Sequence, residues 1–398
     1  MTHPLSGIRV LEVANFIAGP FCAAQLADLG ADVVKVEDPR RGDNVRQTGP
    51  FLEGGESSPF VRLNRNKRSL ALDLKSAEGK QVFRRLAASA DVVVENLRPG
   101  AMAGLGLDYP SLEPENPGLV YLAASAWGGD GPLSSLPGLD IIVQGMAGLM
   151  SITGEQGGPP VKAGVPICDL VCALYGALGV VAALSARQQT GRGQLVEVNL
   201  FEAGTSLTLW EAGRYLATGE VPGPLGSAHQ TTAPYQAVRT ADGHVTIGAI
   251  TPATWQGLCR ALGAPELLSD PRFADNPSRH AHRRELAELI EEVTERKPTE
   301  EWLSLLREAG VPCGPINTYD QVVADPQLEA NGFFVALPHP RLGPLTVLGS
   351  PMHFSETPGR MERAGPSLGE HSFEVLREIG LTEGEAEGLT RRGIVAAP

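Results

Sequence analysis

Asp169 is the residue whose position in the sequence most directly suggests covalent chemistry. It follows the segment AGVPIC and precedes the apolar run LVCALYGALGVVAAL, which predicts a buried helix opened by this carboxylate. One interpretation is structural, because an Asp there commonly accepts hydrogen bonds from the first N–H groups of a helix, and the local pattern alone favours it. The other is catalytic, because an ionised carboxylate at a helix N-terminus can attack a thioester and form an acyl anhydride.

Positive charge gathers at two places near predicted strands. The residues of these two clusters are Arg40, Arg41, Arg46, Arg65, Lys67 and Arg68. Such runs are most often solvated surface. Two clusters at comparable strand edges of an acidic chain also suggest a polyphosphate ligand, which basic side chains bind through charge-assisted hydrogen bonds.

The first predicted βαβ unit argues against a nicotinamide-dependent dehydrogenase. Its second strand ends in the acidic pair Glu37 and Asp38, as in dinucleotide-binding units. The turn over residues 15–20, however, holds one glycine where the phosphate-binding fingerprint needs three. This turn still follows the carboxyl end of a strand, where open α/β sheets bind ligands.

Neither a metal site nor a disulfide framework is expected. The five cysteines are scattered and show no metal-ligand spacing: Cys22, Cys168, Cys172, Cys259 and Cys313. Cys168 and Cys172 are better interpreted as small packing residues of a helix than as nucleophiles.

The composition indicates a soluble globular protein of more than one domain. The chain has 398 residues, and 33 Lys and Arg against 46 Asp and Glu give a net charge of −13. A nucleic-acid-binding protein needs a basic face, so that class is excluded. We expect a cytoplasmic protein without a membrane partner, because no signal-peptide pattern is present and the longest apolar run, 170–184, is short of the ~20 residues that span a bilayer.

Strand and helix patterns alternate through the first half of the chain. The predicted strands are 7–14, 32–39, 69–74, 91–97 and 119–128, and helices are predicted at 21–31 and 77–90. Strands that alternate with helices imply a parallel sheet covered on both faces. The sequence therefore predicts an α/β fold, with a Rossmann-like doubly wound sheet in a large domain.

A change in composition predicts a second, smaller α+β domain. The predicted ranges are 1–217 for the large domain, 218–236 for a Gly/Pro-rich linker, 237–330 for the small domain and 331–398 for a segment that returns to the large one. A hairpin turning at residues 241–243 opens the small domain. Residues 337–360 are Pro-rich and are expected to be irregular.

Several long motifs, in this order along the chain, resemble one known family. They are GIRVLEVANFIAGPFCAAQLADLGADVVKVEDPRRGD, LNRNKRSLALDLKSAEGK, VENLRPG, TGRGQLVEVNLFEAG and AGVPCGPINTYDQVVADPQ. Nearly the whole chain resembles the family III CoA transferases, which include formyl-CoA:oxalate and carnitine CoA transferases and the α-methylacyl-CoA racemases. The resemblance implies that Asp169 is the nucleophile of a ping-pong reaction between an acyl-CoA and a carboxylic acid, through an aspartyl-CoA thioester.

The same resemblance implies the ligands and the assembly. Coenzyme A would be a substrate, with no tightly bound cofactor and no metal. The residues that the resemblance assigns to CoA binding are Ile17, Ala18, Leu72, Asp73, Leu74, Lys75, Asn96, Leu97 and Arg98. The family's usual assembly implies a homodimer of two interlocked, ring-like subunits, and the linker at 218–236 fits it.

Two departures from the family pattern bear on substrate choice. Formyl-CoA transferases carry Gln at the position of Ile17 and Arg at the position of Asp38, so formate or oxalate specificity is not expected here. Arg40 or Arg41 is expected to supply the missing cation, and we assign Arg41 to CoA binding.

The loop over residues 226–230 lies where the family has a mobile glycine-rich loop. Here it carries polar side chains, and we expect His229 or Gln230 to contact the acyl group or a second carboxylate of a dicarboxylic acid. An ordinary exposed loop is the alternative.

A racemase on the same fold and a non-catalytic CoA-binding protein are the remaining alternatives. Racemisation needs a proton-transfer group on each face of the α-carbon. Racemases of this superfamily supply a His and a Glu where this chain has Leu139 and Thr251. Neither side chain can replace them near neutral pH, so the sequence favours the transferase, and Asp169 argues against a non-catalytic protein.

Overall fold

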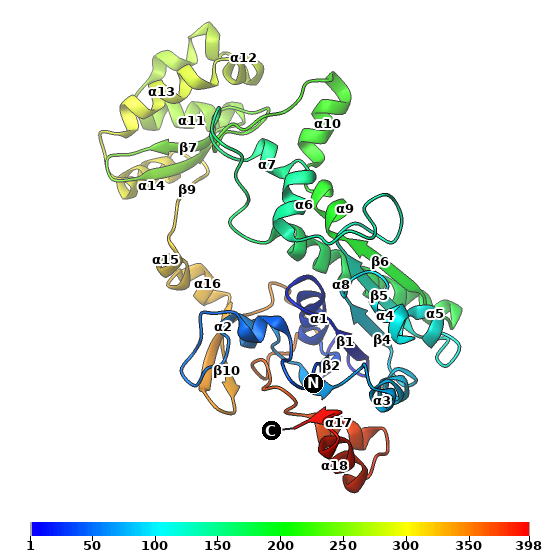
Figure 1. Ribbon diagram of the computed structural model, residues 1–398. Coiled ribbons are helices and arrows are strands. Elements are labelled where there is room, and N and C mark those ends of the chain that lie inside the picture. The colour runs from blue at the N-terminus through cyan, green and yellow to red at the C-terminus, as the bar shows by residue number, and fades with distance from the viewer. Residues whose placement is uncertain (1, 398) are drawn as a thin grey trace. The chain divides into compact units, whose positions relative to one another are not determined.

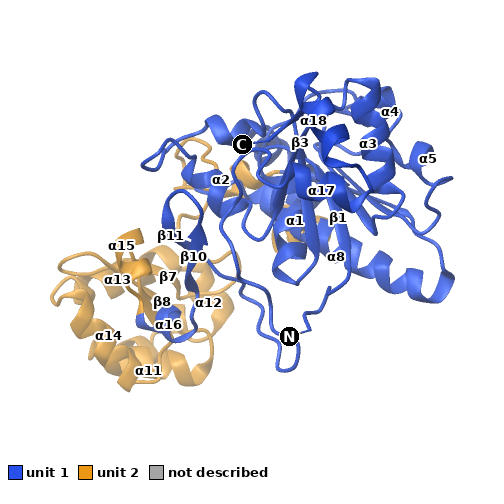
Figure 2. Ribbon diagram, turned by 90° about the horizontal axis from the view of Figure 1, so that it is seen from below, with its two compact units in different colours: residues 1–147, 164–207, 326–398 blue, residues 148–163, 208–325 orange. Residues whose placement is uncertain are grey.

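The computed structural model describes residues 2–397 and forms two compact units (Figure 2). The first unit comprises Met1–Ala147, Gly164–Leu207 and Pro326–Pro398, and the second comprises Gly148–Ala163 and Thr208–Asp325. The chain therefore enters the second unit twice. The predicted large domain, 1–217, differs from this division because it includes residues 148–163 and 208–217, where no change in composition marks a crossing.

A seven-stranded sheet forms the centre of the first unit (Figure 1). Six parallel strands are β1 (Arg9–Val13), β2 (Asp32–Glu37), β3 (Arg68–Leu72), β4 (Val92–Glu95), β5 (Val120–Ser125) and β6 (Leu195–Asn199). The short strand β12 (Val395–Ala396) pairs antiparallel with β3 at one edge. The strand order is β12-β3-β2-β1-β4-β5-β6. The predicted mixed α/β fold with a large, mostly parallel sheet is confirmed, and this order places a topological switch point beside β1.

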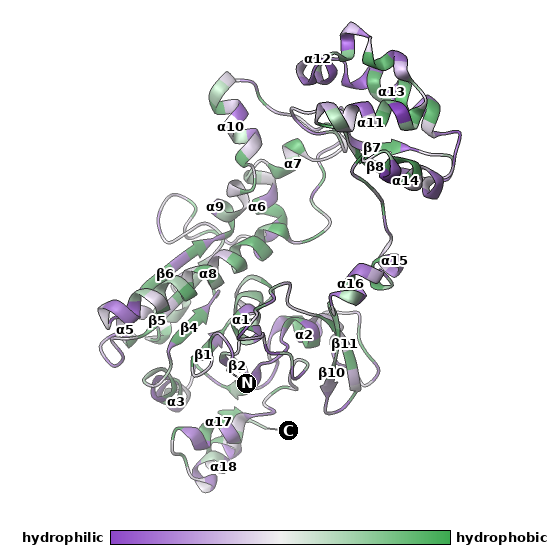
Figure 3. Ribbon diagram, turned by 180° about the vertical axis from the view of Figure 1, so that it is seen from behind, coloured by the Kyte–Doolittle hydropathy of each residue, from purple (hydrophilic) through white to green (hydrophobic). Residues whose placement is uncertain are grey.

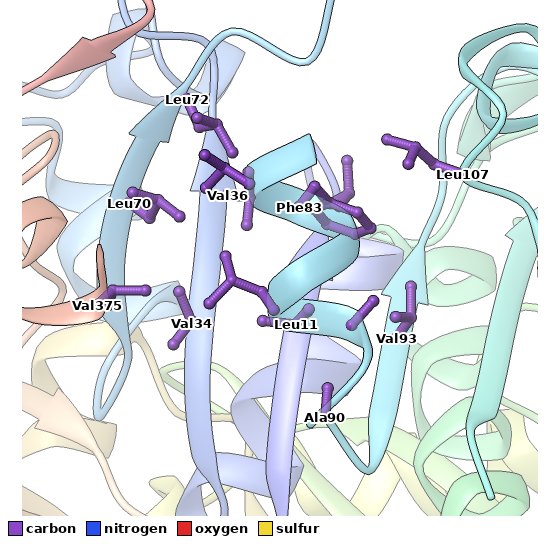
Figure 4. Close-up of a cluster of buried hydrophobic side chains, with 14 of the residues drawn as sticks. Leu11, Val34, Val36, Leu70, Leu72, Phe83, Ala90, Val93, Leu107 and Val375 are labelled. Atoms are coloured by element: carbon purple, nitrogen blue, oxygen red, sulfur yellow. The ribbon is translucent and has the colours of Figure 1, made fainter. Parts of the chain in front are cut away.

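One face of this sheet is covered by α3 (Ala77–Ala87), α17 (Ser372–Glu378) and α18 (Glu383–Arg391). Figure 4 shows strand side chains from β1, β2, β3 and β4 gathered around Phe83 of α3. Phe83 and Leu11 have no exposed surface. Burial of this kind is the main favourable contribution to folding.

The opposite face is covered by α1 (Ala18–Asp28) and α8 (Ile167–Thr190). Successive strand side chains point to opposite faces, so Val10 packs here while its neighbour Leu11 packs on the other face. Strands buried on both faces read as nearly continuous apolar runs, which is why the sequence revealed them. 

Small residues allow α1 and α8 to pack closely together and against the sheet. A Cβ at Gly176 of α8 would lie 3.0 Å from Leu122 Cδ2 and 3.3 Å from Cys22 Sγ of α1. The two helices consequently pack side by side.

The helix α8 is longer than its apolar core suggested. It runs 24 residues, and by length and composition alone it could cross a membrane. The expectation that this apolar segment is too short to span a bilayer, drawn from residues 170–184, was therefore wrong. Of its most apolar 18-residue stretch, 44% is buried inside the protein. The other side of the helix exposes Leu174 and Leu178, and Figure 3 shows its hydrophobic colouring.

The remaining elements of the first unit connect and cover the sheet edges. Its short helices are α2 (Ser58–Leu63), α4 (Ala101–Leu105), α5 (Tyr109–Leu112), α6 (Asp140–Met146), α9 (Leu200–Ser206) and α16 (Pro326–Ala330). The expectation of an irregular segment over 337–360 was wrong in its first part. The strands β10 (Phe334–His339) and β11 (Gly343–Leu348) form an antiparallel hairpin there, in which Pro338 faces Pro344. A two-stranded ribbon tolerates prolines that a central strand excludes.

The second unit contains a three-stranded antiparallel sheet and several helices. Its strands are β7 (Tyr235–Arg239), β8 (His244–Gly248) and β9 (Cys313–Pro315). Its helices are α7 (Leu149–Ile152), α10 (Leu209–Thr218), α11 (Pro252–Leu262), α12 (Asn276–Ala281), α13 (Arg283–Thr294), α14 (Thr299–Glu308) and α15 (Tyr319–Val323). The β7–β8 hairpin turns where the sequence predicted it, and Trp255, Phe273 and Trp302 lie in the core of the unit.

Candidate active site

A cavity of about 740 Å³ lies at the carboxyl edge of the large sheet. Parallel strands end on one edge, so the segments that follow β1, β2, β3 and β4 meet there. Of the residues expected to bind CoA or to supply the missing cation, those lining this cavity are Arg40, Arg41, Leu72, Asp73, Leu74, Lys75 and Leu97. Ile17, Ala18, Asn96 and Arg98 are not among its lining residues.

The turn between β1 and α1 has an unusual backbone. Phe16 has a φ of 61°, in the left-handed region that non-glycine residues seldom adopt, and it is 52% exposed. Its N–H donates to Asp43 Oδ1 at 3.2 Å. Asn96 Oδ1 accepts from the N–H of Asn15, and Asn96 Nδ2 donates to the carbonyl of Asn15, each at 2.8 Å. The side chain of Asn96 therefore orients this turn, and its contact with CoA stays a prediction.

The first N–H groups of α1 follow this turn and have no protein acceptor. No side chain caps the helix, and among residues 2–397 the N–H groups of Ile17, Ala18 and Gly19 have no partner. Ala18 and Gly19 are buried. Gly19 is required because a Cβ there would lie 2.5 Å from Ala14 Cβ. Unpaired N–H groups at a helix N-terminus form an environment suited to negative charge.

Four fully buried charged side chains support the turn. Lys35 Nζ lies 2.6 Å from Glu12 Oε1 and 2.8 Å from Asp43 Oδ2. Lys67 Nζ lies 2.7 Å from Glu12 Oε2. The two ammonium groups also donate to the backbone carbonyls of Ala14 and Pro20. These pairs tie both ends of the turn to β1, β2 and the segment before β3.

The cluster at residues 65–68 does not form a solvated face, so that interpretation was wrong, and its cations are paired with carboxylates rather than directed at a polyphosphate. Its side chains are buried, and its ion pairs are Arg65 with Asp28, Lys67 with Glu12, and Arg68 with Asp32, Glu374 and Glu378. In the other cluster, Arg46 forms two hydrogen bonds to Glu37. Arg40 and Arg41 of this second cluster are exposed and line the cavity, as does Lys75.

Asp169 lies in the first turn of α8 and does not cap it. The helix begins at Ile167, two residues before Asp169, and Pro166 precedes it without a side-chain cap. The cap comes from Asp140 of α6, whose Oδ1 accepts from the N–H groups of Cys168 at 2.9 Å and Asp169 at 3.3 Å. The structural interpretation of Asp169 as a cap is therefore wrong, because a residue distant in sequence performs that role.

The environment of Asp169 changes its acidity. Burial, and secondarily the nearby carboxylate of Asp140, raise the pKa of Asp169 to about 7. The same surroundings raise the pKa of the buried Cys172 thiol to about 12, so it stays protonated. A carboxyl group that titrates near neutral pH is common at functional sites, whereas a protonated buried thiol is a poor nucleophile.

Asp169 lies at the same edge of the sheet as the turn after β1. The helix α1 leads from the end of β1 to the start of β2, and α8 leads into the start of β6 (Figure 1). Because these strands are parallel, both helices run from the carboxyl edge towards the amino edge. Their first turns therefore share the edge that holds the cavity.

Replacing Asp140 with Asn is expected to shift the pH dependence of the reaction. Asn keeps an oxygen that can accept the α8 N–H groups but removes a negative charge, so the pKa of Asp169 falls. The acid limb of kcat/KM, where activity is lost as Asp169 becomes protonated, then moves to lower pH by up to about one unit. The exposed Asp130→Asn variant is the control. A limb that stays in place or moves upward contradicts this assignment.

The loop residues predicted to contact the acyl group lie in the second unit. The His229 ring packs edge-on against Trp210 and Tyr235, with centroids 5.7 and 5.2 Å apart. Its Nδ1 accepts from the N–H of Thr231 at 3.2 Å. Gln230 lines a separate cavity of this unit.

The positions that distinguish a racemase hold no proton-transfer pair. Leu139 is 63% exposed and precedes α6. Thr251 caps α11, with its hydroxyl accepting from the N–H of Thr254. Asp140 accepts hydrogen bonds from the first N–H groups of α8. In addition, residues 2–397 contain no cluster of three or more His, Cys, Asp or Glu side chains that could hold a metal ion.

Comparison with known proteins identifies the family. The sequence profile of CoA-transferase family III matches residues 5–372. The chain belongs to this family. It is 39% identical to the succinate–glutarate CoA-transferase of Agrobacterium fabrum, covering 96% of each chain. It is 35% identical to the human succinyl-CoA:glutarate CoA-transferase, covering 98% of this chain and 90% of that one.

A solved structure agrees with this membership. A CaiB/BaiF family protein from Brucella suis is 38% identical, with a TM-score of 0.86 over 95% of this chain and 100% of that one. The family III CoA-transferase described here moves CoA from an acyl-CoA thioester to a free carboxylic acid. The resemblance found in the sequence and the transferase interpretation are both confirmed.

Proposed function

We propose that this family III CoA-transferase uses a free dicarboxylic acid as acceptor and Asp169 as nucleophile. The observation that carries the nucleophile is a carboxyl group of pKa about 7 in the first turn of α8, at the sheet edge that holds the 740 Å³ cavity. Support for the acceptor class comes from relatives named for succinate and glutarate.

The proposed reaction proceeds through acyl transfers to and from Asp169. Its carboxylate attacks the thioester carbonyl carbon, the C–S bond breaks, and CoA leaves as the thiolate. The thiolate attacks the Asp169 carbonyl of the mixed anhydride, which releases the donor acid and leaves an aspartyl-CoA thioester. The acceptor carboxylate attacks this thioester, and the released thiolate then takes the acceptor acyl group and frees Asp169.

The protein's contribution to this sequence is charge stabilisation and the exclusion of water. The unpaired N–H groups of Ile17, Ala18 and Gly19 can stabilise a tetrahedral oxyanion. Because each step conserves the energy of an activated acyl group, the enzyme must keep water away from both the anhydride and the thioester. The half-buried setting of Asp169 suits that requirement.

Arg41 is proposed to bind the phosphates of CoA, together with Lys75 from the segment after β3, which lines the same cavity. Arg41→Ala is expected to raise the KM for acyl-CoA by about 10- to 100-fold, because a charge-assisted hydrogen bond contributes roughly 1.5–3 kcal/mol. The kcat should change little, since Arg41 does not touch the reacting atoms. Steady-state kinetics, with Lys80→Ala outside the cavity as control, check this; a loss confined to kcat contradicts it.

We also propose that the protein is a homodimer of interlocked subunits and is located in the cytoplasm. The exposed apolar residues of α8, Leu174, Tyr175 and Leu178, form a surface that a second copy could cover. All five cysteines are free thiols, which suits a reducing compartment. Light scattering of the purified protein measures the dimer, and a monomer at micromolar concentration contradicts it.

A panel of acyl-CoA donors and free acids tests the proposed function. Mass spectrometry of the CoA products should show transfer to dicarboxylic acids in preference to monocarboxylic acids of the same length. A parallel reaction in deuterated water should show no exchange of the α-hydrogen of a 2-methylacyl-CoA. Fast exchange that depends on Asp169 would instead indicate a racemase.

A further inference from the structure

The second unit contains a cavity of about 400 Å³ that is separate from the one beside the large sheet. Its walls come from α10, α12, α13, the segment 220–225 and two glutamines. The charged or polar lining residues are Gln156, Arg214, Glu220, Gln230, His280 and Arg283, and the apolar ones are Val221, Pro222, Pro224 and Leu225. Its size falls within the range of small-molecule sites.

The cavity carries more positive than negative charge, in a chain whose net charge is −13. Its lining contains two guanidinium groups, of Arg214 and Arg283, and one carboxylate, of Glu220. Arg214 uses Nε and Nη2 on Glu220 Oε2, at 3.2 and 2.7 Å, and Nη1 on the carbonyl of Gln230, at 3.2 Å. The Glu220 side chain is 62% exposed, so it neutralises Arg214 weakly.

Arg283 has most of its hydrogen-bonding capacity unused. Its Nη1 donates to the carbonyl of His280 at 3.2 Å, and among residues 2–397 no carboxylate lies within ion-pair distance of it. A half-buried guanidinium with four free N–H groups and no counter-ion is unusual, because burial of unpaired charge is costly.

His280 lies close to both arginines. Burial and the positive charges of Arg283 and Arg214 lower the pKa of its imidazole, so the ring is neutral near pH 7. Its Nε2 is buried and has no hydrogen-bond partner. The cavity thus combines two cationic groups, a neutral imidazole whose Nε2 has no hydrogen-bond partner, and an apolar wall.

We propose that this cavity binds a small dicarboxylate anion. Arg214 of α10 and Arg283 of α13 would each hold one carboxylate, a geometry that suits the planar guanidinium. The apolar residues of the segment 220–225 would cover the methylene chain between them. The choice of diacids among anions rests on the proposed function, and the inference adds a diacid-binding site in the second unit that is distinct from the cavity beside the large sheet.

Isothermal titration calorimetry on the full-length Asp169→Asn protein tests this site without turnover. The probes are glutarate, succinate, butyrate and inorganic phosphate at constant ionic strength. We expect the two diacids to bind at least about tenfold more tightly than butyrate or phosphate, since only they engage both arginines. Arg283→Gln should weaken diacid binding at least about tenfold, the cost of one charge-assisted pair. Arg260→Gln, an exposed arginine of α11 outside the cavity, should leave it unchanged.

Three results would overturn the site. They are equal diacid binding by Arg283→Gln, equally tight binding of phosphate or butyrate, and no measurable diacid binding. The donor and acceptor panel distinguishes this failure from failure of the proposed function. If the active enzyme transfers CoA to diacids while the Arg283→Gln variant binds them normally, the site alone is wrong.

Discussion

The Asp169→Asn variant is expected to lose CoA transfer by at least about 10³-fold while remaining folded. Asn is nearly isosteric but offers no carboxylate to attack a thioester. The α8 cap survives, because it is supplied by Asp140 rather than by the replaced residue. Initial rates from a matched set of wild type, Asp169→Asn and Asp130→Asn measure this effect, and near wild-type transfer by Asp169→Asn contradicts it.

The same substitution should stabilise the protein at high pH. The folded-state pKa of Asp169, about 7, lies above the ordinary value of 3.8, so the folded protein binds this proton more tightly than the unfolded chain. Stability contributed by the protonated group is therefore lost as pH rises from about 4 to about 7. Asp169→Asn removes this loss, so its Tm should exceed that of wild type at pH 8 and match it near pH 4. A lower Tm at pH 8 would show that the ionised carboxylate is structural.

Replacing Lys35 with Met should destabilise the protein by about 3–5 kcal/mol, because it leaves two buried carboxylates without their shared cation. Glu12 and Asp43 lie 2.6 and 2.8 Å from Lys35 Nζ, and none of the three side chains is exposed. Asp43 also holds the N–H of Phe16, so the turn beside the cavity should loosen and the KM for acyl-CoA should rise.

Urea denaturation of wild type and Lys35→Met measures the free-energy change. Arg391→Met is the matched control, since it breaks an exposed ion pair with Glu387 and should cost less than about 1 kcal/mol. An effect of Lys35→Met no larger than this control would show that the buried cluster contributes little.

The central sheet could be predicted because it is buried on both faces. Strands β2 and β4 each contain three valines, and the helices between the strands keep their periodicity. The β10–β11 hairpin was missed because Pro338 and Pro344 conceal a strand pattern that a two-stranded ribbon tolerates. The crossing at residues 148–163 was missed because it depends on long-range packing, which leaves no local signal.

The candidate site was only partly accessible from the sequence. The family motifs in the sequence predicted Asp169 as the nucleophile, and they predicted that Arg41, Lys75 and neighbouring cavity residues bind CoA. The cap from Asp140 was missed because it joins residues that are 28 or more positions apart. The burial of Arg68 and Lys67 was missed because a basic run contains no information about the carboxylates that reach it from other elements. The left-handed backbone of Phe16 had no sequence signal, because turns of this kind usually contain glycine.

Mass spectrometry of the trapped intermediate tests the central role of Asp169 most directly. The protein is incubated with an acyl-CoA donor, quenched in acid and digested. A CoA-sized adduct is expected on the peptide containing Asp169, absent from Asp169→Asn and present in Asp130→Asn. An adduct on a different residue, such as Cys168, combined with transfer by Asp169→Asn, would contradict it.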